Sequence, residues 1–482
     1  MTSGQVETQT AASRPRFGLF GFAVPIWRIA VVALVLLLAA AIAISPAPAG
    51  MPQHSMVALG LVAMTVVLWA TLAIPPSAAA IMFTILVLAT RAAPPLAAVS
   101  GFLSSSLWLV FGGLLIGAAA ERTGFGRFIA RRFLGRFRSS YSALVLGVIA
   151  GTTLLTFLVP SNMGRLAITV PVVLALAKDA GYRLGSNGHI GLVLIAVVGN
   201  FGVGQGVLPA NLLNIMIVGA GETLYGIDMT YMHYFLLCAP VLGIVKAFLV
   251  WRLLIRMHPA PTPCSDEDGS KADQLSPEAK RVGILLALAI LLWATDFWHG
   301  FKPGWVALLV GVLCITPGIG VLPVREIVNP HRLLIIIWVG TVLSLASVMT
   351  ESGASTLISS ALARLAGVEG QGPAYGYFAM AYLSSLISVL ATFGGAVPIM
   401  ATVAAEISNA TGLPLETAVM AIAPGMSAMF FPYMASPFVV GLAMGHVSHR
   451  AALPFMVTLA LVTCAIIIPL NAFWWWLLEF LP

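Results

Sequence analysis

The sequence predicts an all-α polytopic membrane protein with about eleven transmembrane helices and two re-entrant hairpins, arranged as inverted repeats. Of the 482 residues, 60% are hydrophobic and 9% are charged, far fewer charges than a soluble globular protein carries. Apolar runs close to the ~20 residues that a bilayer requires follow one another along the chain. The net charge of +7 comes mainly from cations in short loops, which is typical of cytoplasmic loops and argues against nucleic-acid binding.

The apolar runs divide the chain into five parts. Residues 1–103 hold a polar N-terminal segment and scaffold helices, 104–257 a first repeat, 258–281 a cytoplasmic linker, 282–331 further scaffold helices, and 332–482 the second repeat with a C-terminal helix. The first apolar run lacks a convincing cleavage site, so we expect an uncleaved helix. The run Trp474-Trp475-Trp476 predicts an aromatic anchor at the membrane interface.

The first repeat contains a break inside an apolar segment. Tyr141–Ala177 is flanked by charge on both sides and carries Pro160-Ser161-Asn162-Met163-Gly164-Arg165 near its middle. Non-helical backbone at membrane depth is tolerated only where it is buried in protein or lines a watery cavity. We therefore expect a hairpin that enters and leaves on one side; the simpler alternative is a kinked helix.

Similar features recur in the second half of the chain. Trp108 and the following Glu121-Arg122-Thr123-Gly124 resemble Trp338 and the following Thr350-Glu351-Ser352-Gly353, an offset of 230 residues between the tryptophans. Corresponding offsets relate Ser161-Asn162 to Ala391–Gly395 and the Pro209–Asn211 break to Ser436-Pro437. Broken segments at matching positions of two halves are typical of a transporter's substrate site.

Charge indicates that the two repeats have opposite orientations. The interfacial arm of the first repeat contains Arg127, Arg131, Arg132, Arg136 and Arg138, whereas its counterpart Thr356–Gly367 contains only Arg364. The positive-inside rule places the first arm in the cytoplasm and the second outside. The same threading predicts a multi-pass protein of the inner (plasma) membrane with a cytoplasmic N-terminus.

The predicted site lies near the bilayer midplane, where the two hairpin tips converge. The expected substrate contacts are Ser161, Asn162, Met163 and Arg165 at the first tip, Thr392, Gly394 and Gly395 at the second, and Asn211, Ser436 and Pro437 in the broken spans. Oxygen atoms of Ser161, Asn162, Gly206 and Thr392 suit a hard cation such as Na⁺, and half-helix N-termini favour an anion. Arg165 is a candidate because an intramembrane arginine is costly; its alternatives are snorkelling and pairing with a carbonyl.

These residues favour a secondary active transporter of small organic anions, with the lipid bilayer and the substrate as its partners. An inorganic anion such as sulfate is the alternative, since one arginine and helix dipoles serve either kind of anion. An intramembrane enzyme has little support, because the spans hold almost no acidic residues and His446 and His449 lie at a predicted rim. We expect no catalytic residues, no metal cofactor and no organic cofactor.

The Pro160-Ser161-Asn162-Met163 segment resembles the Ser-Asn-Thr signature of the divalent anion/sodium symporter family. With Arg165 it is closer to the bacterial and plastid branch of 2-oxoglutarate/malate, citrate and tartrate carriers. The resemblance implies a sodium- and dicarboxylate-binding hairpin in an elevator-type homodimer. Met163 departs from the family's threonine, and Ala391–Gly395 lacks the second signature, which leaves sodium symport, proton coupling and anion exchange open.

Overall fold

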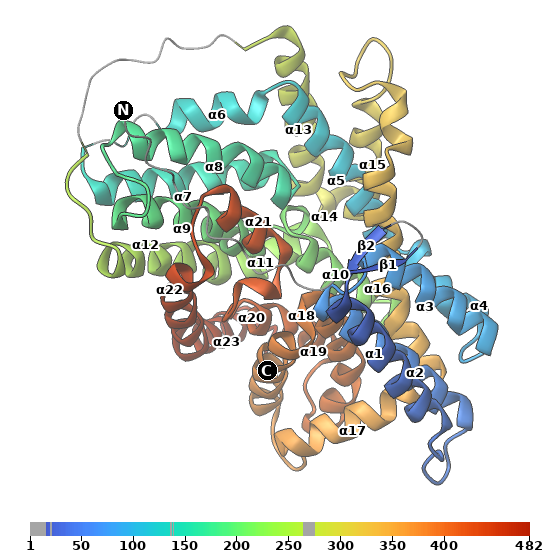
Figure 1. Cartoon of the computed structure of the whole chain (residues 1–482). Coiled ribbons are helices and arrows are strands. Elements are labelled where there is room, and N and C mark those ends of the chain that lie inside the picture. Colours follow the sequence, from blue (N-terminus) through green and yellow to red (C-terminus); the bar gives the residue numbers. More distant parts are fainter. Residues whose placement is uncertain (1–15, 20–21, 135–136, 138, 264–274) are drawn as a thin grey trace, which may run out of the picture.

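The computed structural model describes residues 16–19, 22–134, 137, 139–263 and 275–482 (Figure 1). Within these ranges, eight helices are long and apolar enough to cross a membrane, and a ninth is counted if Pro95–Leu103 and Ser105–Arg122, bent by 45°, form one span. Four shorter apolar helices of the described residues, Pro76–Thr90, Leu212–Tyr225, Pro303–Leu313 and Leu415–Met426, are not in this count, and the expected eleven spans stay a prediction. The chain is a multi-pass α-helical protein, as predicted. Much of the expected linker, 264–274, and the N-terminal residues 1–15 lie outside the described residues.

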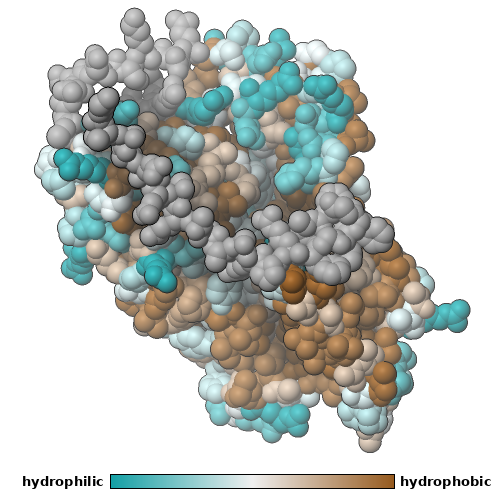
Figure 2. Space-filling view, in the orientation of Figure 1, coloured by the Kyte–Doolittle hydropathy of each residue, from teal (hydrophilic) through white to brown (hydrophobic). Residues whose placement is uncertain are grey.

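The chain begins with a small strand pair and the first helices. These elements are β1 (Arg16–Leu19), β2 (Phe22–Pro25), α1 (Ile26–Ile44), α2 (Gln53–Thr71), α3 (Pro76–Thr90), α4 (Pro95–Val99) and η1 (Ser100–Leu103). The two strands pair antiparallel, a feature that the all-α prediction missed. Helix α1 is apolar but only 11% buried, which suits a helix at the lipid boundary. Figure 2 shows a broad apolar surface over this part of the molecule.

The first repeat runs through α5 (Ser105–Arg122), α6 (Phe125–Leu134), α7 (Tyr141–Leu158), α8 (Asn162–Asp179), α9 (Asn187–Gly202), η2 (Val203–Gly206), η3 (Leu208–Ala210), α10 (Leu212–Tyr225), α11 (Tyr231–Cys238), the π-helix η4 (Ala239–Val245) and α12 (Lys246–Met257). Helices α7 and α8 form a hairpin. The rings of Tyr141 at the start of α7 and Tyr182 just after α8 lie 5.8 Å apart, so the two ends of the hairpin meet at its base.

Between the repeats lie α13 (Pro277–Ala294), α14 (Asp296–His299), α15 (Pro303–Leu313) and η5 (Val324–Val328). Helix α15 packs tightly against α5 through glycines. A Cβ atom built on Gly304 would lie 1.9 Å from the Ser105 carbonyl oxygen, and one on Gly112 would lie 2.2 Å from that of Ala307. These two helices therefore approach backbone to backbone, which only glycine allows at these positions.

The second repeat comprises α16 (Pro330–Glu351), α17 (Ala354–Ala366), α18 (Pro373–Thr411), α19 (Leu415–Met420), α20 (Ile422–Met426), η6 (Pro432–Met434), α21 (Ser436–Met444), α22 (His449–Val462), the π-helix η7 (Thr463–Ile467) and α23 (Ile468–Leu477). Element α18 is the second hairpin. A straight 39-residue helix would extend ~58 Å. Instead, a Cβ on Gly376, near its start, would lie 2.3 Å from Oγ1 of Thr411 at its end.

The two repeats have the same order of elements: a long helix, an arm, a hairpin, a broken span and a final span with a π-helix. The arm α6 lies along the upper edge of the view and the arm α17 along the lower edge, as expected for inverted repeats (Figure 1). The π-helices η4 and η7 occupy matching places in the two repeats. Pro240 is the second residue of η4, and Pro469 lies at the start of α23, directly after η7. This arrangement favours the predicted inversion of the repeats, which stays a prediction.

Two of the C-terminal tryptophans make hydrogen bonds inside the protein, while the interfacial anchor predicted for the run stays a prediction. The indole N–H groups of Trp474 and Trp475 donate to the carbonyl oxygens of Leu236 and Leu237 at 2.9 Å each. Those carbonyls lie just before Pro240, which has no N–H to offer the preceding turn. Trp475 is fully buried. At least two of the three tryptophans therefore complete hydrogen bonding around η4.

Candidate functional site

The tip of the first hairpin is a short non-helical segment between α7 and α8. Pro160 and the extended Val159 end α7, and the Ser161 hydroxyl accepts a hydrogen bond from the Gly164 N–H at 3.2 Å, capping α8. A Cβ on Gly117 of α5 would lie 3.1 Å from the Ser161 Cβ, so α5 supports the tip closely. Both polar atoms of the Asn162 amide are buried and have no hydrogen-bond partner in the protein.

Unpaired buried polar groups are costly, so native proteins rarely keep them without a ligand, water or ion to satisfy them. The Asn162 amide offers one acceptor and two donors. Its oxygen suits a hard cation, and its N–H groups suit an anion. The amide therefore fits Na⁺ as a coupling ion, and its binding there stays a prediction. Met163 is 45% exposed next to them.

Arg165 holds the site together from behind. Its side chain is fully buried, and its guanidinium donates to the carbonyl oxygens of Val159 at 2.8 Å and of Asn200 and Ala210 at 2.9 Å each. These carbonyls come from the first tip, the end of α9 and the broken span. Of the sequence alternatives for Arg165, the structure favours pairing with carbonyls. Contact with an anion through its unpartnered Nε stays a prediction.

The tip of the second hairpin is Thr392, whose backbone has φ 56° and ψ 175°. This region of conformational space is occupied almost only by glycine, so the tip stores strain of ~1–3 kcal/mol. Gly394 packs against Trp338 of α16, and a Cβ on Gly395 would lie 2.8 Å from the Val66 side chain of α2. Both glycines permit close packing around the tip, and the substrate contact predicted for them stays a prediction.

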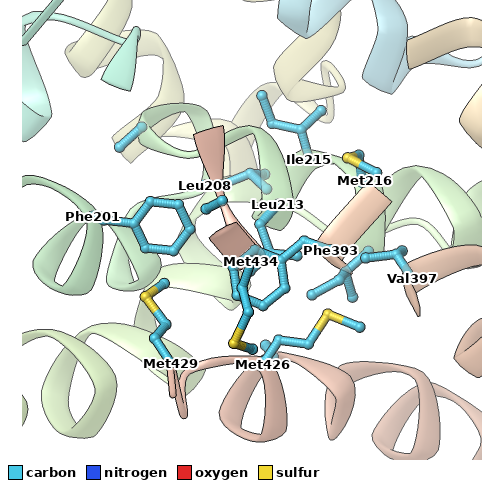
Figure 3. Close-up of a cluster of buried hydrophobic side chains, with 14 of the residues drawn as sticks. Phe201, Leu208, Leu213, Ile215, Met216, Phe393, Val397, Met426, Met429 and Met434 are labelled. Atoms are coloured by element: carbon cyan, nitrogen blue, oxygen red, sulfur yellow. The ribbon is translucent and has the colours of Figure 1, made fainter. Parts of the chain in front are cut away.

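A shared aromatic contact links the second tip to the first repeat. The ring of Phe393, next to Thr392, stacks on Phe201 of α9 with a centroid distance of 5.8 Å, and Phe438 of α21 lies 5.2 Å from Phe201. Figure 3 shows Phe201 and Phe393 in a buried cluster with methionines from the second repeat. Phe201 directly follows Asn200, whose carbonyl binds Arg165. The two tips thus approach the same end of α9.

The broken spans supply the remaining predicted residues. The Asn211 side chain caps α10 through Leu213 N–H at 3.2 Å and keeps its own buried amide nitrogen without a partner. Gly204 faces the Arg165 guanidinium, and Gly206 packs on Ala239 of η4. In the second repeat Ser436 is exposed and Pro437 half-buried at the start of α21. These contacts leave the predicted ligand roles of Asn211, Ser436 and Pro437 open.

A buried lysine was missed by the sequence analysis. Lys246, at the start of α12, is 2% exposed, and its ammonium donates to Gln205 Oε1 at 3.2 Å and to the Ser427 carbonyl at 2.6 Å. Gln205 belongs to the broken span of the first repeat, and Ser427 follows α20 in that of the second. Lys246 therefore connects the two breaks. A cation inside the apolar run Tyr234–Leu254 was the available signal.

A family model for the sodium:sulfate symporter transmembrane region matches residues 26–481. The chain belongs to the sodium:sulfate symporter family. This agrees with the resemblance of Ser161-Asn162 to the divalent anion/sodium symporters. Within the described residues, no three His, Cys, Asp or Glu side chains form a metal-binding group.

Among relatives of this family member, a membrane protein of Cupriavidus necator is 27% identical over 333 residues, 64% of this chain and 65% of that protein, just under two thirds of its length. The Escherichia coli inner membrane protein YbhI is 23% identical over 92% of this chain and 96% of its own. The sodium-dependent dicarboxylate transporter SdcS of Staphylococcus aureus is 22% identical over 67% of each.

Two solved transporter structures share the fold of this symporter-family chain. The YdaH transporter of Alcanivorax borkumensis, described as having an unusual topology, superposes with a TM-score of 0.52 at 15% identity over 93% of this chain and 97% of that one. MtrF of Neisseria gonorrhoeae, described among antimetabolite efflux pumps, gives 0.53 at 14% identity over 92% and 94%. At such low identity these likenesses concern the fold alone.

Proposed function

We propose that this protein is a secondary active transporter of small organic anions, di- or tricarboxylates, that works by an elevator mechanism. The observation that carries the proposal is Asn162. Its amide is buried without a partner at the tip of the first hairpin, and the second tip contacts the following helix, α9, through Phe393 and Phe201. A group kept unsatisfied at such a cost is expected to bind a ligand.

The choice of a carboxylate rests on the relative SdcS, which is named for dicarboxylate transport, and on the resemblance of Ser161-Asn162 to dicarboxylate carriers. The branch that carries 2-oxoglutarate, malate, citrate or tartrate is the nearest by its Arg165. An inorganic anion such as sulfate is the second candidate, because the family's description names sulfate. Both anions present acceptor oxygens, so the transport assay has to separate them.

Coupling to an ion or to a second anion follows from the charges of the site. We infer that Ser161, the Asn162 oxygen, Gly206 and Thr392 are the ligands of a sodium ion. Arg165 is a buried cation next to the first tip. Its charge balances part of that of an anion, so exchange of one anion for another is a second mode consistent with the site.

Alternating access is supported by unequal contacts in the two repeats. The first tip touches α5 at Gly113 and Gly117, whereas the second touches α16 at Trp338, which corresponds to Trp108 of α5. The contacts therefore differ by five to nine helix positions, 113 and 117 against 108. At 1.5 Å per residue this is roughly 7–13 Å along the helix. Exchanging the contacts between the repeats generates a second state, in which the site opens to the other side.

The remaining proposals concern the cell. We infer an inner-membrane location with a cytoplasmic N-terminus, from the arginines of the first arm and from the relative named an inner membrane protein. A homodimer is implied by the resemblance. The mass of the protein in native membranes or nanodiscs, compared with a 50.5 kDa chain, tests the dimer.

The function is tested by uptake into liposomes that contain the purified protein. Labelled succinate, malate, 2-oxoglutarate, citrate, tartrate and sulfate are offered with and without a sodium gradient, and with and without unlabelled anion inside. We expect uptake of at least one carboxylate and a loss of at least tenfold in Asn162→Ala, since two or more ligand bonds are removed. Sulfate uptake alone would favour the second candidate, and unchanged uptake in Asn162→Ala would remove Asn162 from the site.

A further inference from the structure

A tryptophan donor without an acceptor lies against the tip of the second hairpin. A Cβ built on Gly394 would be 3.1 Å from Cζ2 and 3.9 Å from Cε2 of Trp338, so the edge of the indole that bears Nε1 lies at the tip. The Trp338 Nε1–H is buried and has no partner. An indole N–H can only donate, so the group that satisfies it has to be an acceptor.

The orientation of this ring is fixed by a second tryptophan. Trp69 of α2 packs edge-to-face on Trp338, with a centroid distance of 6.3 Å. The indole of Trp69 is itself satisfied, because its Nε1–H donates to the Pro76 carbonyl at 3.1 Å. Of this pair, Trp338 alone therefore presents a free donor.

Thr341, three residues further along α16, is a second unpaired donor. Its side chain is 1% exposed, and its hydroxyl has no partner. A helical threonine or serine usually donates back to the carbonyl four residues earlier, as Ser344 does to Gly340 at 2.9 Å and Thr350 to Ala346 at 3.1 Å. Thr341 makes no such bond. Because residues three positions apart are neighbours on a helix surface, Thr341 and Trp338 lie on the same side of α16.

We propose that Trp338 Nε1–H and Thr341 Oγ1–H bind an oxygen of the transported anion at the second tip. The segment Ala391–Gly395 has few polar side chains, so this tip by itself offers an anion little. Two neutral donors on α16 supply what the tip lacks, while Asn162 serves the first tip. This inference rests on the proposed function and adds residues that decide how tightly the anion is held.

The experiment uses Trp338→Phe, which keeps the ring and removes the N–H, and Thr341→Val, which keeps the shape and removes the hydroxyl. Each is measured in liposomes for the KM and maximal rate of uptake, with carboxylates and sulfate as separate arms. We expect the KM to rise about tenfold in either variant, because a hydrogen bond to a charged acceptor is lost. The arm in which the KM rises identifies the anion.

The matched control is Trp69→Phe, which alters the same ring pair but removes an N–H that already has its acceptor. Its KM should stay at the wild-type value. Thermal unfolding of all three variants checks that they fold. If Trp338→Phe does not fold, Thr341→Val still tests the inference. A wild-type KM in both donor variants would overturn the assignment of Trp338 and Thr341, and so would a KM that rises as much in Trp69→Phe as in Trp338→Phe. Either result would leave the proposed function standing. A wild-type protein that carries none of the anions would overturn the proposed function as well.

Discussion

Arg165 and Lys246 are buried cations that solve the same problem in different ways. Within the described residues neither forms an ion pair with a carboxylate, and both are held by neutral oxygens. Arg165 has a weakly hydrated, planar guanidinium that satisfies three backbone carbonyls at once. Lys246 has a compact, strongly hydrated ammonium with two acceptors, one of them a side chain that can reorient. The cost of removing water is therefore larger for Lys246 and its compensation smaller.

This difference predicts opposite effects on stability. Arg165→Met leaves three carbonyls without donors at ~1–3 kcal/mol each, so we expect a clearly lower melting temperature. Lys246→Met leaves two oxygens unpaired but removes a buried charge, so we expect an equal or higher melting temperature together with at least a tenfold loss of uptake. Thermal unfolding in detergent and liposome uptake measure the two effects. A destabilised Lys246→Met protein that still transports normally would show that Lys246 stabilises the fold and has no role in transport.

The strained Thr392 gives a second prediction at this scale. Glycine accepts its φ of 56° without a clash, but it also gains freedom in the unfolded chain. We expect Thr392→Gly to stabilise the protein by ~1 kcal/mol, the strain released less the entropy lost. Thr392→Ala is the control, because it removes the hydroxyl and keeps the Cβ. Equal stability of the two variants would show that the tip is not strained.

At the scale of the element, a charged cluster joins α10 to the paired helices α5 and α15. The Glu222 carboxylate of α10 accepts from the Ser105 and Ser106 N–H groups at 3.3 Å each, at the N-terminus of α5. Lys302, just before α15, forms ion pairs with Glu222 at 3.2 Å and with Asp228. Since α10 continues the broken span, this cluster links the site to the helices that we expect to stay still.

We expect Lys302→Met to weaken this link and to change the rate of uptake without changing the KM. The hydrogen bond from Lys302 to Asp228, followed by that to Glu222, raises the pKa of Lys302 despite partial burial. Because the pKa of Lys302 is raised in the folded protein, its charge contributes stability. This contribution is fully present below the ordinary lysine pKa of 10.5 and is lost as the pH rises through the pKa of the folded state. The variant-to-wild-type ratio of uptake rates should therefore be constant from about pH 6 to 9. A ratio that varies in this range would contradict the assignment to Lys302.

Single elements show what the sequence could predict. Pro160 and the charged flanks of Tyr141–Ala177 predicted the first hairpin, because proline and capping serine act locally. The second hairpin was found only through the repeat, since its break is one residue, Thr392, inside an otherwise helical pattern. The bonds of Lys246 to Gln205 and Ser427 join positions 41 and 181 residues away, and no local pattern specifies such contacts.

Across the whole molecule, the matching π-helices η4 and η7 support the internal repeat more directly than the sequence similarity between the two halves does. Their sequences, Ala239–Val245 and Thr463–Ile467, share little. Yet carbonyls near both receive side-chain donors, from Trp475 beside η4 and from Tyr382, which donates to Cys464 at 3.0 Å. Architecture is thus conserved between the halves where side chains are not, which explains why sequence predicted the repeat but not its contacts.

The exchange of tip contacts between two states can be trapped by disulfides. Gly113→Cys paired with Pro160→Cys should cross-link in the state described here, because a Cβ built on Gly113 lies 3.7 Å from the Pro160 Cβ, a separation that a disulfide spans. Trp108→Cys paired with Pro160→Cys should cross-link only in the other state. We expect each bond to stop uptake and reduction to restore it. Cross-linking of the first pair without loss of uptake would exclude the movement.

The central claim is that two hairpins from opposite halves bind one anion between their tips. It is tested most directly by replacing the four native cysteines with serine and introducing Met163→Cys or Thr392→Cys, one at each tip. A thiol reagent is then applied with increasing concentrations of the transported anion. The account predicts that the anion protects both positions with the same half-maximal concentration. Protection of only one tip, or of neither, would contradict it.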